Sequence, residues 1–236
     1  MSTKHSDVSI QALRQIEVFR SVDDDTLRSW RNEFEWHRYS ANQQIVSQNE
    51  PSSDVHFVCG GLVRATIFAA SGKEVTFQDL GPGEIFGELA AIDSKPRTTH
   101  VLALADSLVA TMTARHFLRL LHNRPDVAIA TLQRLSGLVR RLCDRVVEFS
   151  TLGVKNRIQA ELLRLARANG VQNNRALIER LPTHAEIASR VSTHREAATR
   201  ELNRLIKSKI LQREGKSLVV TDVARLERMV EDVQDH

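Results

Sequence analysis

Apolar residues recur at different spacings along the chain, and each spacing predicts a different kind of element. Within residues 8–38, Ile10 and Leu13, and later Leu27 and Trp30, lie three positions apart. That spacing places them on one side of short amphipathic helices. We expect these helices to pack on the edge of the domain that follows.

Between residues 39 and 112 the apolar residues form short runs instead. The runs are QQIVSQ, DVHFVC, LVRATIF, EVTFQDL, EIFGEL, THVLAL and SLVATM, and several of the segments between them contain Gly, Pro, Asn or Ser. Short runs divided by turn residues at this spacing are typical of an antiparallel barrel or roll. The segment is therefore predicted to form one β-domain.

From residue 126 to 150 the period becomes helical again. Six apolar residues lie three or four positions apart over more than two heptads, which is the seam of a coiled coil. We expect this seam to pack against the same helix of a second chain in a parallel homodimer, while Ile129, Leu138 and Val147 face the chain's own β-domain. The predicted interface residues are Leu132, Leu135, Val139, Leu142, Val146 and Phe149.

The C-terminal part reads as a helix-turn-helix followed by a small wing. After a break at residues 149–153, which we interpret as a hinge, a helix is predicted over residues 154–168. A polar loop, VQNNRALIER, separates it from two helices joined by a tight turn, and each of these begins with a capping-box sequence, at Thr183 and at Thr193. The segment LQREGKSLVVTD is then predicted to form strand, turn and strand.

Positive charge is concentrated in this second part. The chain of 236 residues has 42% hydrophobic and 26% charged residues and a formal net charge of +4. From residue 151 onward there are 16 Lys and Arg against 11 Asp and Glu, whereas the first 150 residues hold 17 against 18. A basic domain joined to a neutral one is the footprint of nucleic-acid binding, although a solvated helical surface gives the same sum.

Length, apolar runs and cysteines narrow the class of protein further. The length favours two domains of ordinary size. No apolar run approaches the roughly 18 residues of a membrane helix, and MSTKHSDVSIQALRQIEVF lacks the apolar core of a secretory signal, so we expect a cytoplasmic protein without membrane contact. Cys59 and Cys143 have no metal-ligand spacing, and we expect two reduced, buried thiols and no metal.

The second helix of the helix-turn-helix carries residues suited to reading DNA. Arg195, Glu196, Thr199 and Arg200 lie near its start, while its apolar residues form the buried side. Arginine can bond O6 and N7 of guanine together, and glutamate can accept from N4 of cytosine. The alternative is an ordinary solvated face. The neighbouring helix, the wing and a dimer seam that would place two such helices about 34 Å apart favour binding to double-stranded DNA.

The stretch GEIFGELAAIDSKPRTTHV, residues 83–101 and here called the cassette, combines two glycines with a glutamate and an arginine. Gly83 and Gly87 permit close backbone approaches, where N–H groups can hold a phosphate oxygen. Glu88 offers acceptors to sugar hydroxyls, and Arg97 offers a fixed fork to a phosphate. A sugar phosphate suits all of these groups. From the residues alone, a Glu88–Arg97 surface pair without a ligand is the alternative.

FGELAAIDSKPRTTHV resembles the phosphate-binding cassette of cyclic-nucleotide-binding domains. With the long helix and AEIASRVSTHREAATREL, it makes residues 36–220 similar to the cAMP receptor protein branch of the Crp–Fnr transcription regulators. The resemblance implies that Glu88 binds the ribose 2′-hydroxyl and Arg97 the cyclic phosphate. It implies further pocket residues Gly87, Leu89, Thr98 and Val75, and a DNA-binding set of Arg195, Glu196, Thr199, Arg200, Thr183 and His194 on a palindrome of TGTGA-like half-sites.

The chain departs from that branch at three places, one of which is a shorter hinge after the long helix. Arg145-Val146 replaces the Thr-Ser pair that touches adenine, so we expect Arg145 to donate to guanine O6. Arg97-Thr98 resembles the end of the cassette in cGMP-binding domains, which implies that Thr98 accepts from the guanine 2-amino group and that both cAMP and cGMP bind. The alternative is that Thr98 bonds only the phosphate and Arg145 is solvated. Ser192 stands in the helix-turn-helix turn where many relatives have glycine, so that turn is expected to be strained or capped differently.

The predicted fold class is α+β, with a cyclic-nucleotide-binding antiparallel β-roll and flanking helices at 1–125, a dimerisation helix and hinge at 126–150, and a winged helix-turn-helix at 151–236. We expect a homodimeric, non-enzymatic transcription regulator that has cAMP, and also cGMP, as its allosteric ligand and binds operator DNA and RNA polymerase. The alternatives are a regulator that senses an iron–sulfur cluster or haem, a ligand-independent one, and an enzyme that uses His184 or His194 as a base. The absence of an N-terminal cysteine cluster and of a partner nucleophile argues against the cluster and the enzyme.

Overall fold

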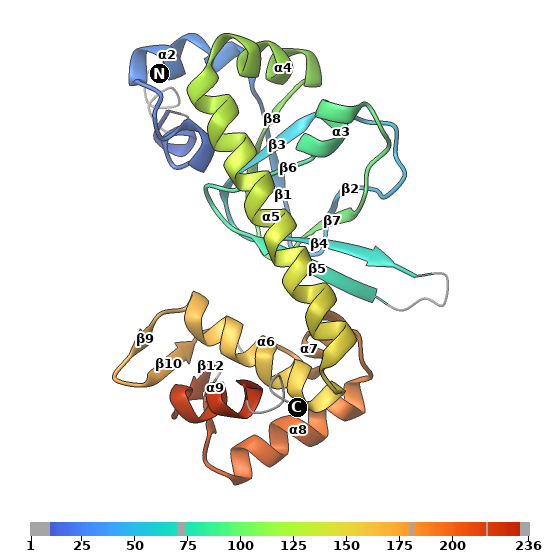
Figure 1. Ribbon diagram of the computed structural model, residues 1–236. Helices are drawn as coiled ribbons and strands as arrows, with labels where there is room; N and C mark the ends of the chain where they lie inside the picture. Colours follow the sequence, from blue (N-terminus) through green and yellow to red (C-terminus); the bar gives the residue numbers. More distant parts are fainter. Residues whose placement is uncertain (1–9, 70–73, 180–181, 216, 232–236) are drawn as a thin grey trace. The chain divides into compact units, whose positions relative to one another are not determined.

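The computed structural model describes residues 10–69, 74–179, 182–215 and 217–231. They form two compact units, which divide between Leu138 and Val139 within one continuous helix, α5 (Figure 1). From the sequence, residues 126–150 of this helix were predicted to form a separate segment between the two domains. No helix among the described residues is long and apolar enough to cross a membrane.

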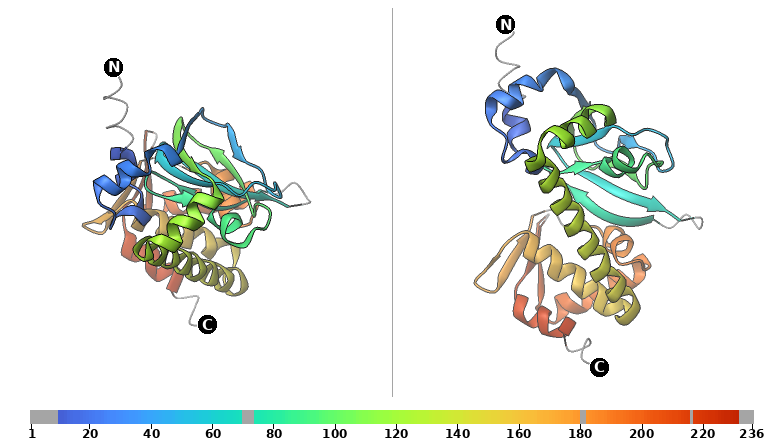
Figure 2. Two further views of the ribbon diagram at one scale, coloured as in Figure 1. Left: turned by 90° about the horizontal axis from the view of Figure 1, so that it is seen from above. Right: turned by 45° about the horizontal axis from the view of Figure 1, so that its top comes forward.

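The first unit contains short N-terminal helices, eight strands and the first part of α5. A helical stretch at residues 10–14 precedes the 3-10 helix η1, and α4 and the start of α5 lie beside these N-terminal helices (Figure 2). The elements are η1 (Glu17–Phe19), α2 (Asp24–Ser29), η2 (Arg31–Glu33), β1 (Glu35–Tyr39), β2 (Gln44–Val46), β3 (Val55–Gly60), β4 (Val63–Phe68), β5 (Glu74–Leu80), β6 (Ile85–Phe86), α3 (Glu88–Asp93), β7 (His100–Ala103), β8 (Ser107–Met112), α4 (Ala114–Asn123) and α5 (Pro125–Thr151).

The eight strands make two four-stranded sheets, in the orders β1-β8-β3-β6 and β2-β7-β4-β5, with antiparallel pairing of β3 to β8 and of β4 to β7. The continuous apolar run in strand β3 is explained by the burial of both faces of the strand. Phe57 packs in a cluster with the N-terminal helices, α4 and α5, whereas Val58 packs with Val63 and Val109 between the strands. Side chains alternate across a strand, so two cores need apolar residues at successive positions. The predicted β-roll is confirmed.

Helix α5 packs on the first unit through a narrower face than the sequence predicted. Its fully buried residues are Val127 and Thr131, one turn apart. Leu138 is half-buried, but Ile129 and Val147 are exposed, so the prediction that they cover the β-domain was wrong. The sheet surface already holds aromatic side chains such as Phe57 and Phe117, and one stripe of small and branched residues suffices to close it.

The second unit is a bundle of helices on a small sheet of order β11-β12-β10-β9. Its core gathers apolar residues from all four helices that follow α5, including Ile158, Ile187, Leu202 and Leu226. The predicted helix-turn-helix and wing are confirmed. The elements are α6 (Val154–Ala168), β9 (Val171–Gln172), β10 (Arg175–Ile178), α7 (His184–Arg190), α8 (Arg195–Lys207), β11 (Leu211–Glu214), β12 (Ser217–Val220) and α9 (Val223–Glu231).

Three local predictions were wrong because tertiary pairing overrode local pattern. Residues 35–38 are strand β1, which pairs with β8, instead of the end of a helix. The run EIFGEL is split into β6 and the first turn of α3 at Gly87, where φ is 84°. The polar loop VQNNRALIER contains the hairpin β9–β10, in which Asn173 and Asn174 take positive φ at the turn.

The predicted capping boxes and the predicted buried cysteines are each confirmed only in part. The capping box at Thr183 and Glu186 is present. The predicted box at Thr193 is not: helix α8 has His194 as its N-cap, with no side-chain cap hydrogen bond. Cys59 is half-buried as a free thiol, and burial raises its pKa to about 12. Cys143 is also free but exposed, so its predicted burial was wrong.

The turn between α7 and α8 is strained, as its sequence suggested. Ser192 has φ of 54°, a left-handed conformation that a residue with a Cβ adopts at a cost. The turn keeps this geometry because the Thr193 N–H donates to the Ala188 carbonyl at 2.9 Å.

We predict that Ser192→Gly raises the free energy of unfolding by up to about 1 kcal/mol, because glycine removes the Cβ clash of the left-handed conformation. The measurement is denaturant-induced unfolding of the full chain. Ser208→Gly is the matched control, since Ser208 has φ of −83° and gains nothing from glycine. A loss of stability in both variants would contradict the prediction.

Candidate ligand site and nucleic-acid interface

The cassette is organised around a close approach between Gly87 and the Arg97 side chain. A Cβ on residue 87 would lie 2.4 Å from Arg97 Nη1 and 2.8 Å from the Asp54 carbonyl oxygen. The φ of 84° at Gly87 also lies in the region that glycine favours. The glycine that the sequence assigned to the ligand therefore also makes room for the arginine.

Arg97 is 4% exposed, and its guanidinium is held in a fixed orientation. Its Nη1 donates to the Gly87 carbonyl at 3.0 Å, its Nη2 to the Asp54 carbonyl at 2.8 Å and its Nε to Ser52 Oγ at 2.9 Å. Because a guanidinium has five N–H donors, one on each terminal nitrogen is left for an anion. Burial lowers the pKa of Arg97, and the charges of Asp54, Glu50 and Glu88 oppose that shift.

Glu88 begins helix α3 and is 5% exposed. Burial raises the pKa of its carboxyl, and the Arg134 charge, its own backbone N–H and the Arg97 charge act in the other direction. Neither Glu88 nor Arg97 is a surface residue, so the alternative of an exposed pair does not apply. A buried carboxylate and a buried guanidinium near each other are the groups that a ribose hydroxyl and a phosphate require.

His56 belongs to the surroundings of this site, although no sequence motif pointed to it. Its ring is buried, stacks on Phe86 at 4.7 Å between centroids and lies 3.0 Å from Thr111 Oγ1 through Nδ1. Burial first, and then the charges of Arg97 and His37, lower its pKa to about 3. His56 is therefore neutral and adds no positive charge beside Arg97.

The other predicted ligand residues divide between the two units. Leu89 and Thr98 lie exposed in the cassette, and Val75 is half-buried in β5. Arg145 lies in the second unit, where its guanidinium is bonded to protein groups. Its predicted contact with a purine stays a prediction, as do the ligand roles of the other residues.

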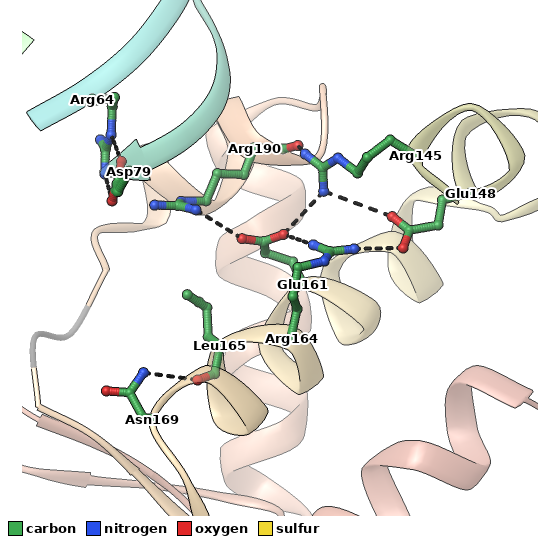
Figure 3. Close-up of polar contacts among 9 residues, drawn as sticks. All are labelled: Arg64, Asp79, Arg145, Glu148, Glu161, Arg164, Leu165, Asn169 and Arg190. Carbon is green, nitrogen blue, oxygen red and sulfur yellow. Dashed lines mark hydrogen bonds and ion pairs between the residues drawn. The ribbon is translucent and has the colours of Figure 1, made fainter. Parts of the chain in front are cut away.

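Figure 3 shows the cluster that engages Arg145, in which three arginines converge on Glu161 of α6. Arg145 Nη1 and Arg190 Nη1 donate to the Glu161 carboxylate at 3.1 and 3.2 Å, and Arg164 also donates to it. Arg145 donates further to the Arg190 carbonyl at the end of α7. Glu148 accepts from Arg164 at 2.6 Å.

This cluster joins the last part of α5, helix α6 and the first helix of the helix-turn-helix. The Glu161 side chain is 3% exposed and that of Arg190 13%, so the interactions are poorly screened by water. Burial lowers the pKa of Arg145, and the Glu161 charge is the largest influence against it. Glu161 was not predicted as a cluster residue. Its one signal in the sequence is a charged residue within the apolar face of the helix predicted over residues 154–168.

We predict that Glu161→Ala lowers the free energy of unfolding by about 3 kcal/mol, because it leaves buried guanidinium groups without a counter-charge. Glu227→Ala is the control, since Glu227 pairs with Arg167 on the surface and should cost less than about 1 kcal/mol. Thermal or denaturant unfolding of the full chain gives both values. Equal losses in the two variants would show that the cluster is not energetically distinct.

The predicted DNA-reading residues lie on α8 and at the ends of the two helices. Arg195, Glu196 and Arg200 are exposed, as is His194 at the N-cap of α8. Thr183 is also exposed, with its side chain accepting from the Glu186 N–H as the cap of α7. The buried side of α8 holds Ala198, Glu201, Leu202 and Leu205.

Thr199 is engaged within the protein. Its hydroxyl donates to the Arg195 carbonyl at 2.9 Å and lies 2.7 Å from His184 Nδ1, while Arg213 Nη2 of the wing lies 2.9 Å from His184 Nε2. Because a guanidinium only donates, Nε2 must accept, and the imidazole is neutral with its proton on Nδ1. Burial and the charges of Arg213 and Arg195 lower the pKa of His184 accordingly. His184 thus links wing and recognition helix.

Among residues 10–69, 74–179, 182–215 and 217–231, no group of three or more His, Cys, Asp or Glu side chains is placed to hold a metal ion. The His184 ring contacts Thr199 and Arg213, and His194 is the N-cap of α8 without a side-chain cap hydrogen bond.

Comparison with known proteins identifies both units. Residues 36–124 match the cyclic nucleotide-binding domain, and residues 156–229 match the Crp-like helix-turn-helix domain. The chain therefore belongs to the Crp–Fnr superfamily of transcription regulators, as the cassette and the helix-turn-helix indicated.

Relatives with both domains extend over most of the chain. A CRP-like cAMP-activated global transcriptional regulator of Mycobacterium tuberculosis is 24% identical over 219 residues, 92% of this chain and 98% of that protein. The Cyclic AMP receptor protein of Thermus thermophilus is 28% identical over 200 residues, 83% and 88% of the two chains. The solved structure of the c-di-GMP responsive regulator CLP of Xanthomonas campestris has a TM-score of 0.72 at 20% identity, and the alignment covers 84% and 99% of the two chains.

Proposed function

We propose that this chain is a homodimeric transcription regulator whose binding to a palindromic operator is controlled by cAMP, and also by cGMP, in the cassette. The observation that carries the proposal is the buried Arg97, fixed beside the buried Glu88 by the carbonyls of Gly87 and Asp54. Two buried charged groups cost free energy unless a ligand or protein partner uses them. A cyclic nucleotide supplies an anion for one and a hydroxyl for the other.

In this proposal each residue has a separate role. Arg97 offers its remaining N–H donors to the cyclic phosphate, and Glu88 accepts from the ribose 2′-hydroxyl. The relatives named for cAMP activation support this choice of ligand. The fold alone does not select it, since a similar structure is described as c-di-GMP responsive. We favour a cyclic nucleotide over an iron–sulfur cluster or haem because the cassette presents a buried carboxyl and a buried guanidinium, which suit a sugar phosphate.

The exposed apolar stripe of α5 supports the homodimer. Leu132, Val139, Leu142 and Val146 are between 41% and 63% exposed in the single chain, and they share one face at heptad spacing. Apolar side chains in such a row on a helix of 27 residues are a coiled-coil surface. A parallel pair would present two copies of α8 to successive major grooves.

Control of DNA binding follows from a shift between two arrangements of the dimer. A ligand that binds one arrangement more tightly shifts the population toward that arrangement. The size of the shift is set by the difference between the ligand's affinities for the two arrangements. Arg195, Glu196 and Arg200 then read TGTGA-like half-sites. RNA polymerase is the expected protein partner, and the cytoplasm is the expected compartment.

We predict that Arg97→Gln lowers cAMP affinity at least about 100-fold, because the phosphate loses its charge-assisted partner. Isothermal titration calorimetry measures the affinity, and operator binding is followed with and without cAMP. Lys95→Gln is the control, an exposed cation in the same segment that should change affinity little. A thermal melt accompanies the titration, since Arg97 also bonds three protein groups. Retained affinity in Arg97→Gln would refute the assignment of the cassette.

We predict that Leu142→Asp gives monomers with little operator affinity even with ligand, because a charge on the seam would be buried without a partner. Light scattering reports the oligomeric state and fluorescence anisotropy reports DNA binding. Leu118→Asp on α4 changes an equally exposed leucine, 42% against 41%, outside the seam, and should remain dimeric. A DNA-competent Leu142→Asp dimer would place the interface elsewhere.

A further inference from the structure

Three elements of the second unit meet at the ring of His184, the first residue of α7. Its Nε2 lies 2.9 Å from Nη2 of Arg213 on the wing strand β11, and its Nδ1 lies 2.7 Å from Thr199 Oγ1 on α8. The Thr199 hydroxyl donates in turn to the Arg195 carbonyl at 2.9 Å. A half-buried histidine thus joins the wing to the start of the helix that carries the predicted DNA-reading residues.

The partners of His184 fix the direction of each hydrogen bond in this row. Because the Arg213 guanidinium only donates, Nε2 accepts, and the single ring proton is on Nδ1, facing the Thr199 oxygen. Arg213 therefore donates to His184, and His184 donates to Thr199. Hydrogen bonds in such a row polarise and strengthen one another. A second proton on the ring would leave no acceptor for Arg213.

The charges around the ring also favour its neutral form. Burial lowers the pKa of His184, and so do the charges of Arg213 from β11 and Arg195 from α8. The acid of its own helix, Glu186, accepts from the Thr183 N–H at 2.7 Å in the capping box. A proton on Nε2 would therefore place two cations at hydrogen-bond distance, and the ring and the Arg213 guanidinium would repel each other.

The Arg213 guanidinium has donors beyond this bond. Arg213 is exposed, and within the described ranges of the chain His184 is the one hydrogen-bond partner of its guanidinium. One imidazole ring separates it from Thr199, which lies one turn after Arg195 on α8. The bond thus sets a wing cation beside the exposed start of α8. Phosphates of the DNA backbone flank the base edges that a helix reads in the major groove.

We propose that neutral His184 is a positioning residue of the DNA interface, which holds Arg213 of the wing beside α8 to contact a backbone phosphate and releases it when the ring is protonated. The proposal rests on the DNA-binding function argued above. A phosphate contact adds affinity and fixes the register of the helix in the groove, but it carries no sequence information. The affinity that Arg213 adds is therefore present while the ring is neutral and is lost as falling pH protonates it.

The first test measures what Arg213 contributes to DNA binding at two pH values. Fluorescence anisotropy compares Arg213→Gln with the unaltered full chain in saturating cAMP, on one duplex with two TGTGA-like half-sites and on one without them. We expect Arg213→Gln to bind both duplexes about fivefold more weakly at about pH 8, and almost as well as the unaltered chain at about pH 5.

Two further variants show whether His184 causes this pH dependence. In a His184→Gln background the side-chain amide does not titrate, so the effect of Arg213→Gln should not change with pH. His122→Gln alters an exposed histidine of α4 and should keep the unaltered profile. An effect of Arg213→Gln that is constant with pH in the unaltered background, or that grows toward acid, would overturn the proposal. A loss confined to the duplex with half-sites would make Arg213 a base contact and overturn it too.

A second measurement needs no DNA and keeps the proposal separate from the proposed function. Nitrogen NMR of labelled imidazole rings distinguishes the two neutral tautomers, and His184→Gln assigns the His184 signals. We expect the proton on Nδ1 at about pH 8, and a titration midpoint that rises in Arg213→Gln because one opposing cation is lost. A proton on Nε2, or an unmoved midpoint, would overturn the proposal. If neither duplex binds the unaltered chain while the ring behaves as expected, the proposed function fails and the link between His184 and Arg213 stands.

Discussion

The buried side chain of Arg97 is the constraint on which the proposed ligand site depends. Its bonds to the Gly87 and Asp54 carbonyls join the cassette to the segment before β3, and the space it needs is available only because residue 87 has no side chain. The turn at Gly87 starts α3, and α3 begins with Glu88. One close contact thus sets the backbone, the proposed anion donor and the proposed hydroxyl acceptor together.

Buried charge recurs in the second unit with a different arrangement. Arg145, Arg164 and Arg190 all donate to the Glu161 carboxylate, and Arg145 also donates to the Arg190 carbonyl. These charges are therefore paired within the protein. Glu88 has no such set of partners, and burial therefore raises its pKa. The contrast separates a structural cluster, which replaces water with protein donors, from a site that leaves capacity for a ligand.

Helix α5 contributes to both units through residues on different faces. Val127 and Thr131 pack on the β-roll, Arg134 reaches the cassette, and Arg145 joins the cluster around Glu161. The apolar residues of the remaining face stay exposed in the single chain. The contact with the cassette and the proposed dimer face therefore lie on one continuous helix.

The sequence by itself determined the elements whose residues repeat with a clear period and the motifs whose residues are adjacent. The helix at 154–168, the helix-turn-helix and the wing follow from local spacing, and even the strain at Ser192 was visible in the turn. The choice of Gly87, Glu88 and Arg97 came from the resemblance of the cassette to cyclic-nucleotide-binding domains. Strand β1 was missed because its pairing with the distant strand β8 decides it. The β9–β10 hairpin had a local signal in Asn173 and Asn174, but its strands are too short and polar to show a strand pattern. The partners of Arg145 and the bond from Arg134 to the Ile85 carbonyl were decided by tertiary structure alone. Long charged side chains reach across several turns, and their destination depends on which elements pack together and on how deeply the packing buries the charge.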